Sequence, residues 1–398
     1  MASSAKKLKD QVGLTGNSAV ALAMKQINPD VCPAYPITPS TAVIETFSDY
    51  FANGEVDTEF ITVESEHSAM SACVGASAAG ARVMTATSSQ GLALMWEVLY
   101  IASGMRFPIV MATVNRALSS PINIHCDHSD SMGARDSGWI QIYSETVQEA
   151  YDNMFQAIRI AEDKRVLTPA MVCMDGFITS HAIENLTLAT DAEVKGFVGD
   201  YTPEHSLLDT DNPVTMGAMT MPDSYMNFKF EQSNAIAGAK EVVVEIGKEY
   251  GKLTGREYGL LDCYNLEDAD VAIVVLSSAA GTTKAAVDEL RKEGKKVGVL
   301  RPRLYRPFPH QEIAEALKGI GAVCVLDRAD SMSGFGGPLF TDIRSALYGI
   351  ENAPLVMGRI FGLGGRDFNV ANAKEVFEET FKALEAGKIE KTTGYITI

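Results

Sequence analysis

Two acidic residues follow a short β-prone run and precede a segment with almost no charge. Residues 60–63 favour a strand, and Glu64, Ser65, Glu66 and His67 come directly after it. Residues 68–80 are small apart from one methionine and one valine, so a helix there is expected to be buried and to allow close approach of a flat ligand. A buried carboxylate at the start of this helix needs a hydrogen-bonding partner, and a ring nitrogen would serve.

Glu66 also has a plainer interpretation, in which it only caps the helix or interacts with its dipole. Glu64 lies two residues earlier, and both carboxylates cannot be buried and ionised cheaply. We therefore expect one of the two to face solvent or a cation.

Arg116 and Thr38 are the candidates for binding an acidic substrate. Arg116 follows the apolar run 108–114, where a guanidinium could bind a carboxylate or pair with a nearby aspartate. Thr38 lies between Pro36 and Pro39 and could contact substrate or cap the next helix. Both alternatives stay open at the level of the residues.

A polar loop contains the histidines and acidic residues that could ligate a metal, namely His125, Cys126, Asp127, His128 and Asp130. The histidines are three residues apart, but no second ligand cluster lies at a recognisable spacing. We predict no metal site in this chain.

Two glycine-rich turns have some likeness to nucleotide-binding loops. They are GFGG at Gly334–Gly337 and GLGG at Gly362–Gly365. Neither forms a full G-x-G-x-x-G motif with a later acidic residue, so both are weak candidates.

Strands and helices alternate along most of the chain, and the strands are continuously apolar. This pattern predicts an α/β fold of doubly wound, mostly parallel sheets buried on both faces. The loops YPITPST, ESEH, TSSQG and NRALSS each follow the carboxyl end of a strand. Open α/β sheets bind ligands at that edge. Thr38, Glu66, Ser89, Gln90 and Arg116 should therefore gather at one rim.

The regular alternation lapses between about residues 186 and 264. We predict a first domain over 1–185, a linker with a long helix (232–253) over 186–264, and a second, smaller domain over 265–398. Within the second domain, RPRLYRPFP (301–309) is predicted to be a rigid basic loop.

Composition narrows the classes of partner and location. A net charge of −17 argues against nucleic acid or an anionic membrane as partner. The six cysteines form no C-x-x-C pair, which argues against a zinc or iron–sulfur module in this chain and favours buried free thiols. The start MASSAKKLKDQ lacks an apolar signal core, and no run of 18 apolar residues exists, so we expect a soluble, cytoplasmic protein.

Several motifs together resemble one enzyme family. AYPITPST, VESEHSAMSACVGASAAGAR, TATSSQGLALM, VNRALSSP, DHSDSMGARDSGW and RPFP resemble alpha subunits of 2-oxoacid:ferredoxin oxidoreductases, with the closest likeness to the pyruvate-specific enzymes (pyruvate synthases). The likeness covers nearly the whole chain. It implies that the first domain is of the thiamine diphosphate pyrimidine-binding type and the second of the transketolase C-terminal type.

The resemblance also implies roles for three residues. Glu66 would contact the aminopyrimidine of thiamine diphosphate and be both catalytic and cofactor-binding, while Thr38 and Arg116 would hold the substrate carboxylate. Relatives that use oxalate carry arginine at the position of Thr38, so threonine argues against a dianionic substrate.

Partner subunits are implied by what the chain lacks. It has no G-D-G motif followed by asparagine, which holds Mg2+ and diphosphate in such enzymes, and no cysteine sets for [4Fe-4S] clusters. By resemblance these belong to beta, gamma and ferredoxin-like delta subunits. The chain alone is therefore expected to be inactive.

The implied reaction is oxidative decarboxylation of pyruvate with coenzyme A to acetyl-CoA and CO2, with reduction of ferredoxin, or the reverse. One alternative is the alpha subunit of a branched-chain 2-oxoacid:ferredoxin oxidoreductase. A further alternative is a non-catalytic, regulatory α/β protein of the same fold, in which Thr38, Glu66 and Arg116 would not converge.

Overall fold

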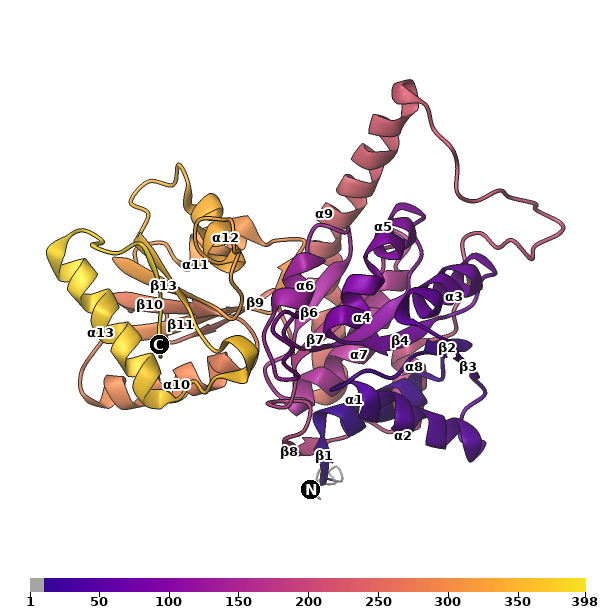
Figure 1. The fold of residues 1–398 in the computed structure, drawn as a ribbon, viewed down its shortest axis with the longest axis horizontal. Coiled ribbons are helices and arrows are strands. Elements are labelled where there is room, and N and C mark those ends of the chain that lie inside the picture. The colour runs from indigo at the N-terminus through magenta and orange to yellow at the C-terminus, as the bar shows by residue number, and fades with distance from the viewer. Residues whose placement is uncertain (1–10) are drawn as a thin grey trace, which may run out of the picture.

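The computed structural model describes residues 11–398 as two α/β bodies, with a long helix projecting from the first (Figure 1). Residues 1–10, which carry most of the start used to argue against a signal peptide, lie outside the described residues. Among residues 11–398, no helix combines the length and apolar character that a membrane span requires.

The first body is built on a parallel sheet. Strands β4 (Met84–Thr87), β5 (Val110–Asn115), β7 (Ala170–Asp175) and β6 (Ile140–Tyr143) lie side by side in that order, and every residue in them is buried. The parallel pair β2 (Val31–Ala34) and β3 (Glu59–Thr62) continues this sheet through a bridge between Val31 and Val83. The prediction of parallel strands buried on both faces is confirmed.

Helices cover both faces of this sheet (Figure 1). One face packs against α1 (Gly16–Ile27), α2 (Thr41–Ala52) and α7 (Val147–Glu162), and the other against α3 (Glu66–Ala78), α4 (Ser89–Leu94) and α5 (Trp96–Gly104). Side chains of β5 alternate between the two cores, as strand geometry requires. Smaller elements are α6 (Ser129–Gly133), α8 (Asp191–Val198) and the antiparallel pair of β1 (Gln11–Thr15) with β8 (Ile183–Thr187).

The prediction that residues 68–80 form a buried helix is only half right. Ala69, Met70 and Cys73 of α3 are buried, but Ser71 and Gly75 on the opposite side are exposed. The small side chains follow from close packing on one face only, because nothing among residues 11–398 covers Ser71 and Gly75 on the other.

The long helix α9 (Pro222–Thr254) begins ten residues before the predicted helix, with Pro222 in its first turn, where proline costs no hydrogen bond. Its second half buries Val243, Ile246 and Tyr250 against the first body. Its first half projects away from both sheets (Figure 1).

The second body contains a six-stranded sheet in the order β15 (Thr393–Tyr395), β14 (Leu355–Ile360), β13 (Ala322–Asp327), β10 (Val271–Val275), β11 (Val297–Pro302) and β9 (Leu261–Tyr264). Only β9 is antiparallel to its neighbour. Helices α10 (Ala279–Lys292) and α13 (Val370–Ala386) pack on one face, and α11 (His310–Ala316) and α12 (Pro338–Leu347) on the other. The core under α11 and α12 is continuous with the core of the first body.

A strand joins the two bodies where the sequence predicted a loop. β12 (Leu304–Arg306) pairs antiparallel with β6 and so extends the first sheet with residues from the second half of the chain. The prediction of a rigid loop over 301–309 is therefore wrong for β12, and also for Arg301 and Pro302, which end β11. Pro302 and Pro307 lie on either side of β12 and leave its residues free to pair.

Candidate functional site

Four loops meet at the carboxyl ends of β2, β3, β4 and β5. The loop after β2 contacts the loop after β5 through a hydrogen bond from Arg116 Nη1 to the Thr38 carbonyl, 3.0 Å long. Helix α4, which follows β4, contacts α3 where Gly91 lies against Glu66. The first residue of α4, Ser89, donates its side-chain hydroxyl to the carbonyl of Ala117, which follows Arg116 (2.6 Å). The predicted convergence of these loops at one rim is confirmed.

Glu66 is a buried carboxylate without a hydrogen-bond partner among residues 11–398. Its side chain is 6% exposed, and it is the first residue of α3. Capping of that helix falls instead to Ser65, whose Oγ accepts the N–H of Ser68. Glu66 does not cap the helix, although its place in the first turn suits an interaction with the helix dipole. That interaction does not require burial, so it leaves the burial of an unpaired carboxylate unexplained.

Glu64 behaves differently from Glu66. It is exposed, and its carboxylate accepts a hydrogen bond from Ser68 Oγ, which holds the pKa of Glu64 below its usual value. The expectation that one of the two carboxylates faces solvent is therefore confirmed.

Gly91 forms one wall against the carboxylate. A Cβ atom at this position would stand 2.7 Å from Glu66 Oε1 and 2.5 Å from Thr87 Oγ1. Thr87 Oγ1 and Ser88 Oγ are themselves buried without hydrogen-bond partners. The rim thus combines unpaired polar atoms with a backbone that any side chain at position 91 would obstruct.

Arg116 is 7% exposed, and its side chain forms no ion pair with any described carboxylate. Nε donates to the carbonyl of Asn123 (3.0 Å), and Nη1 donates to the carbonyl of Thr38. Nη2 has no hydrogen-bond partner among residues 11–398. The local salt bridge considered from the sequence is absent from this part of the chain, and the guanidinium keeps donors free for an anion.

Thr38 lies on the exposed loop after β2, and its carbonyl, not its side chain, makes the contact with Arg116. The side chain is exposed and does not cap α2, whose cap residue is Ser40. Its role at the site stays a prediction.

Asp130 ties two of these loops together and was not singled out from the sequence for this role. It is 3% exposed, and its Oδ2 accepts the backbone N–H groups of both Ser89 and Arg116, each at 2.9 Å. Oδ1 accepts Asn115 Nδ2 (2.8 Å) and the N–H of Ser131 (2.7 Å). Burial raises the pKa of Asp130 to about 6, although these hydrogen bonds act to lower it.

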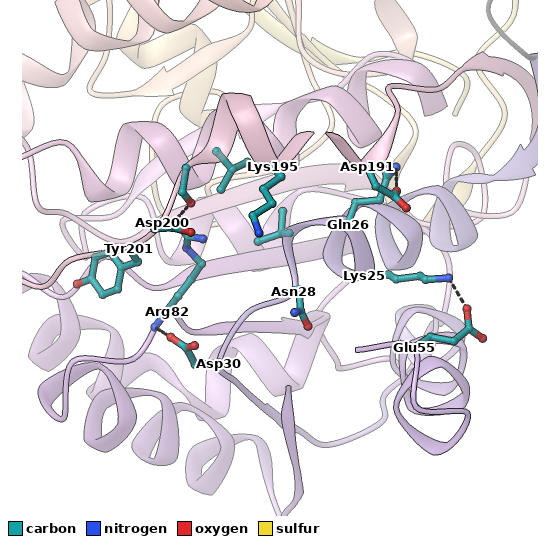
Figure 2. Close-up of a pocket in the computed structure, with 13 residues that line it drawn as sticks. Lys25, Gln26, Asn28, Asp30, Glu55, Arg82, Asp191, Lys195, Asp200 and Tyr201 are labelled. Atoms are coloured by element: carbon teal, nitrogen blue, oxygen red, sulfur yellow. Dashed lines mark hydrogen bonds and ion pairs between the residues drawn. The ribbon is translucent and has the colours of Figure 1, made fainter. Parts of the chain in front are cut away.

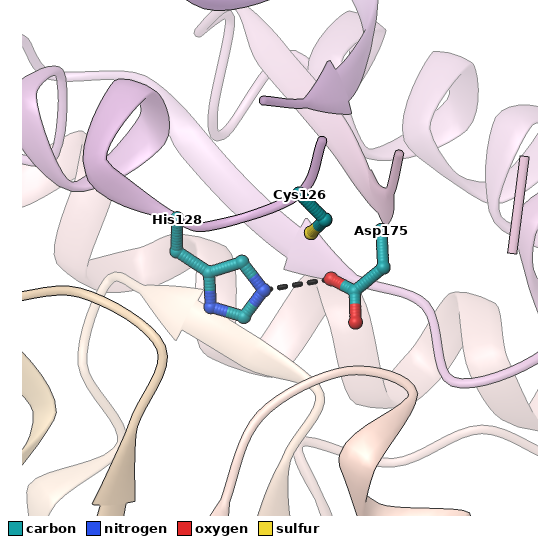
Figure 3. Close-up of side chains that lie close together, drawn as sticks. All are labelled: Cys126, His128 and Asp175. Atoms are coloured by element: carbon teal, nitrogen blue, oxygen red, sulfur yellow. Dashed lines mark hydrogen bonds and ion pairs between the residues drawn. The ribbon is translucent and has the colours of Figure 1, made fainter. Parts of the chain in front are cut away.

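The polar loop with possible metal ligands splits into two environments. His125 is exposed and lies near the ring of Phe177, whereas His128 is buried and its Nε2 lies 2.7 Å from Asp175 Oδ1 (Figure 3). Cys126 lies beside this pair, so that one ligand atom from each of Cys126, His128 and Asp175 falls within 4.8 Å of the others.

This buried group joins the two bodies, because Asp175 also accepts the hydroxyl of Ser278. Burial raises the pKa of Asp175, but the charges of His128 and Arg328 outweigh it, so the pKa lies below its usual value. The nearby charge of Arg328, which acts to lower the pKa of Asp175, also opposes a further cation, and we assign no metal to this group.

A cleft of about 500 Å3 lies at the opposite, amino-terminal ends of the strands (Figure 2). Two of its three cations are already paired, Lys25 with Glu55 and Arg82 with Glu162, and the third is Lys195. It shares no residue with the rim that carries Glu66 and Arg116.

Comparison with known proteins places this architecture. The model for the thiamine diphosphate-binding domain of pyruvate flavodoxin/ferredoxin oxidoreductases matches residues 22–248. The chain belongs to this family. The model for pyruvate:ferredoxin oxidoreductase core domain II matches residues 269–373.

Curated relatives of the family match nearly the whole chain. Pyruvate synthase subunit PorA of Thermotoga maritima is 51% identical over 94% of this chain and 95% of its own length. Ketoisovalerate oxidoreductase subunit VorA of Pyrococcus abyssi is 44% identical over 95% of both chains. The names of both relatives describe subunits, so the family assignment implies partner chains.

Two solved structures share the fold. A 2-oxoglutarate:ferredoxin oxidoreductase from Magnetococcus marinus matches with a TM-score of 0.74 at 22% identity, over 94% of this chain and 65% of its own. A split-gene transketolase, solved as an inactive tetramer of beta subunits, matches with a TM-score of 0.53 at 12% identity, over 93% of this chain and 99% of its own. The predicted fold class, a thiamine diphosphate-type domain followed by a transketolase-type domain, is confirmed.

The described residues fit the cofactor that the family implies. A flat aminopyrimidine needs a buried hydrogen-bonding partner, and the unpaired carboxylate of Glu66 would be available as one. It also needs a backbone that approaches closely, which Gly91 supplies. Residues for Mg2+ and diphosphate are expected from another chain.

Proposed function

We propose that this chain is the alpha subunit of a pyruvate:ferredoxin oxidoreductase, which decarboxylates pyruvate with coenzyme A to acetyl-CoA and CO2 and reduces ferredoxin, or runs in reverse. The observation that carries the proposal is the buried, unpaired carboxylate of Glu66 against Gly91, in a domain of the thiamine diphosphate-binding family. The relatives named pyruvate synthase support pyruvate as the substrate.

Thiamine diphosphate, when bound, supplies the electron sink for decarboxylation. Glu66 would hold a proton between its carboxylate and a nitrogen of the aminopyrimidine, which fixes the tautomer of that ring. Burial strengthens this hydrogen bond because little water competes for it. Gly91 would leave room for the ring.

Arg116 would bind the carboxylate of the 2-oxoacid. Its two observed hydrogen bonds go to carbonyl groups, of Asn123 and Thr38, so they orient the guanidinium without neutralising its charge. The free Nη2 group can then donate to a substrate carboxylate. Thr38, next to Arg116 on the rim, would add a hydroxyl to the same contact.

We infer that beta, gamma and delta subunits complete the enzyme, and that the subunit completing the cofactor site docks along α4, α5 and the projecting half of α9. Near the site, His67 pairs with Glu97 of α5 (3.8 Å), and α4 and α5 expose Leu94, Trp96 and Ile101. The hydroxyl of Ser103 in α5 accepts Gln232 of α9 (3.1 Å), so the surface continues onto that helix.

The end of this surface, at and just before the start of α9, carries a group of large exposed apolar side chains. Six are more than half exposed: Met219, Met221, Tyr225, Met226, Phe228 and Phe230. At roughly 150–250 Å2 for a large side chain, they offer on the order of 800 Å2, which equals one side of a standard protein interface. Because the proposed enzyme needs partner subunits, we assign this exposed apolar surface to contact with one of them.

The test is to purify the complex through a tag on this chain and measure viologen reduction with pyruvate, 3-methyl-2-oxobutanoate and 2-oxoglutarate, with and without coenzyme A. We expect the highest kcat/KM with pyruvate and dependence on coenzyme A. A preference for 3-methyl-2-oxobutanoate would support the branched-chain alternative, which the VorA relative keeps open. If the complex oxidises none of the three 2-oxoacids, the regulatory alternative is favoured.

A further inference from the structure

The GLGG turn of the second body faces the loop that positions Arg116. The turn follows β14 and contains Gly362, Gly364 and Gly365 at φ of 62°, 58° and 80°. The sequence made it a weak candidate for nucleotide binding. In the fold, its backbone groups bond to residues 123–127 of the first body.

Three hydrogen bonds make this contact. Asn123 Nδ2 donates to the carbonyl of Gly364 (2.9 Å), the N–H of Gly365 donates to the carbonyl of Cys126 (2.7 Å), and the N–H of Gly364 donates to Asp127 Oδ2 (3.2 Å). The turn has no space for side chains, because a Cβ at Gly364 would overlap Asn123 Nδ2 and one at Gly365 would stand 2.5 Å from His125 Cβ. Protein atoms therefore occupy the space that a nucleotide phosphate would need at this turn.

Asn123 connects the GLGG turn to Arg116, because it forms hydrogen bonds with both. Its carbonyl accepts Arg116 Nε at 3.0 Å, while its Oδ1 accepts the N–H of His125 at 2.7 Å. Nε to Asn123 is one of only two hydrogen bonds that fix the Arg116 guanidinium within residues 11–398. The orientation of Arg116 thus depends on a residue whose side chain is fixed by the second body.

Other contacts hold the two bodies together independently of this turn. The N–H of His128 donates to the carbonyl of Arg328 (2.8 Å), and Ser277 Oγ donates to the carbonyl of Ser144 (2.8 Å). A change at Gly364 can therefore move Asn123 without separating the bodies.

We propose that the GLGG turn is a positioning element for substrate binding, with Gly364 and Asn123 as the positioning residues that set the Arg116 guanidinium for the 2-oxoacid carboxylate. This inference rests on the proposed function. It assigns to the second body a part in substrate affinity, although that body supplies no residue at the rim.

The test uses the whole complex with Gly364→Ala, and Gly349→Ala as matched control. Gly349 also has a positive φ (76°), but a Cβ there meets nothing within 4 Å. We expect Gly364→Ala to raise KM for pyruvate at least about tenfold with kcat changed less than about threefold, the pattern of lost uniform binding. The KM for added thiamine diphosphate should stay within about twofold, because Glu66 and Gly91 are not touched.

A double-mutant cycle separates positioning from general damage. Asn123→Ala should raise KM for pyruvate by a similar factor. In the Asn123→Ala background, Gly364→Ala should change KM no more than Gly349→Ala does, since the Asn123 side chain that its Cβ would overlap is gone. Independent, additive effects on KM would overturn the inference. If Gly364→Ala prevents assembly, Asn123→Ala alone still decides, and an unchanged KM in that variant overturns it.

The outcomes also distinguish this inference from the proposed function. A wild-type complex that oxidises no 2-oxoacid overturns both. An active wild type in which Gly364→Ala behaves like Gly349→Ala overturns only the role of the turn.

Discussion

The carbonyl oxygen of Thr38 accepts a 3.0 Å hydrogen bond from Nη1 of Arg116, although the two residues are 78 positions apart. The two residues proposed to bind one substrate carboxylate are therefore joined directly. Because the bond uses the main chain of Thr38, substitution of its side chain leaves the orientation of Arg116 unchanged, and the two side chains can be tested separately.

Arg116→Lys should lower kcat/KM for pyruvate by about 100-fold or more, because an ammonium cannot make both carbonyl contacts and still bind a carboxylate bidentately. Arg165→Lys, at an exposed ion pair with Asp163 and Glu245, is the control and should have no effect. Steady-state viologen reduction by the complex measures both. A wild-type KM in Arg116→Lys would assign substrate binding to another residue.

Glu66→Gln should leave the fold intact and reduce turnover by at least about 100-fold, since the amide cannot hold the proton that the carboxyl shares with the ring. Glu64→Gln is the matched control, because Glu64 is exposed and two residues away. Circular dichroism checks the fold, and viologen reduction checks the rate. Near-normal turnover in Glu66→Gln would mean that a different carboxylate does this work.

Gly91→Ala should weaken thiamine diphosphate binding and destabilise the chain by about 1–3 kcal/mol, because its Cβ would press on Glu66 Oε1 and Thr87 Oγ1. Gly75→Ala, in the interior of α3 where a Cβ meets nothing within 4 Å, should be neutral or stabilising. Thermal unfolding and the KM for added thiamine diphosphate measure the two effects. Equal behaviour of the two variants would remove Gly91 from the site.

Asp130 should make stability depend on pH. Its pKa is raised to about 6 in the fold and lies near 3.9 in an unfolded chain, so the stabilisation from its proton is complete below about pH 4 and is lost as pH rises to about 6. A shift of this size corresponds to about 3 kcal/mol.

Asp130→Asn removes this titration. As pH rises from 4 to 6, the melting temperature of the variant should therefore rise relative to that of the wild type, and above pH 6 the difference should stay constant. A difference that is constant from pH 4 to 7 would contradict the assignment. At pH 7 the variant should also bind 2-oxoacid more weakly, because the amide keeps only one of the two oxygens. Its NH2 group would face either the N–H donors of Ser89 and Arg116 or the donors of Asn115 and Ser131.

Phe228→Glu together with Met226→Glu should abolish assembly with the partner subunit while leaving the melting temperature of the chain unchanged, since both side chains are more than half exposed. Tyr348→Glu is the control, because Tyr348 is 90% exposed on the second body, away from α9. Co-purification and size-exclusion chromatography give the readout. A complex that forms normally with the double substitution would place the interface elsewhere.

Much of the fold could be predicted because a strand buried on both faces must be apolar along its length. This rule located β5, β7, β10 and β13. It missed β6, which contains the buried polar residue Gln141, whose amide nitrogen donates to the carbonyl of Ser131 within the core. Five of the six cysteines are buried free thiols as expected, and Cys263 is the exception.

The sequence by itself determined which loops meet, because parallel strands direct their carboxyl ends to one edge and so bring Thr38, Glu66 and Arg116 together. Only the tertiary structure decided how those side chains are held. Asp130 bonds to Ser89 across 41 positions, and Asn123 bonds to Gly364 across 241. Hydrogen bonds over such separations have no periodic signal in the sequence, because they depend on how two bodies dock and not on the local pattern of apolar residues.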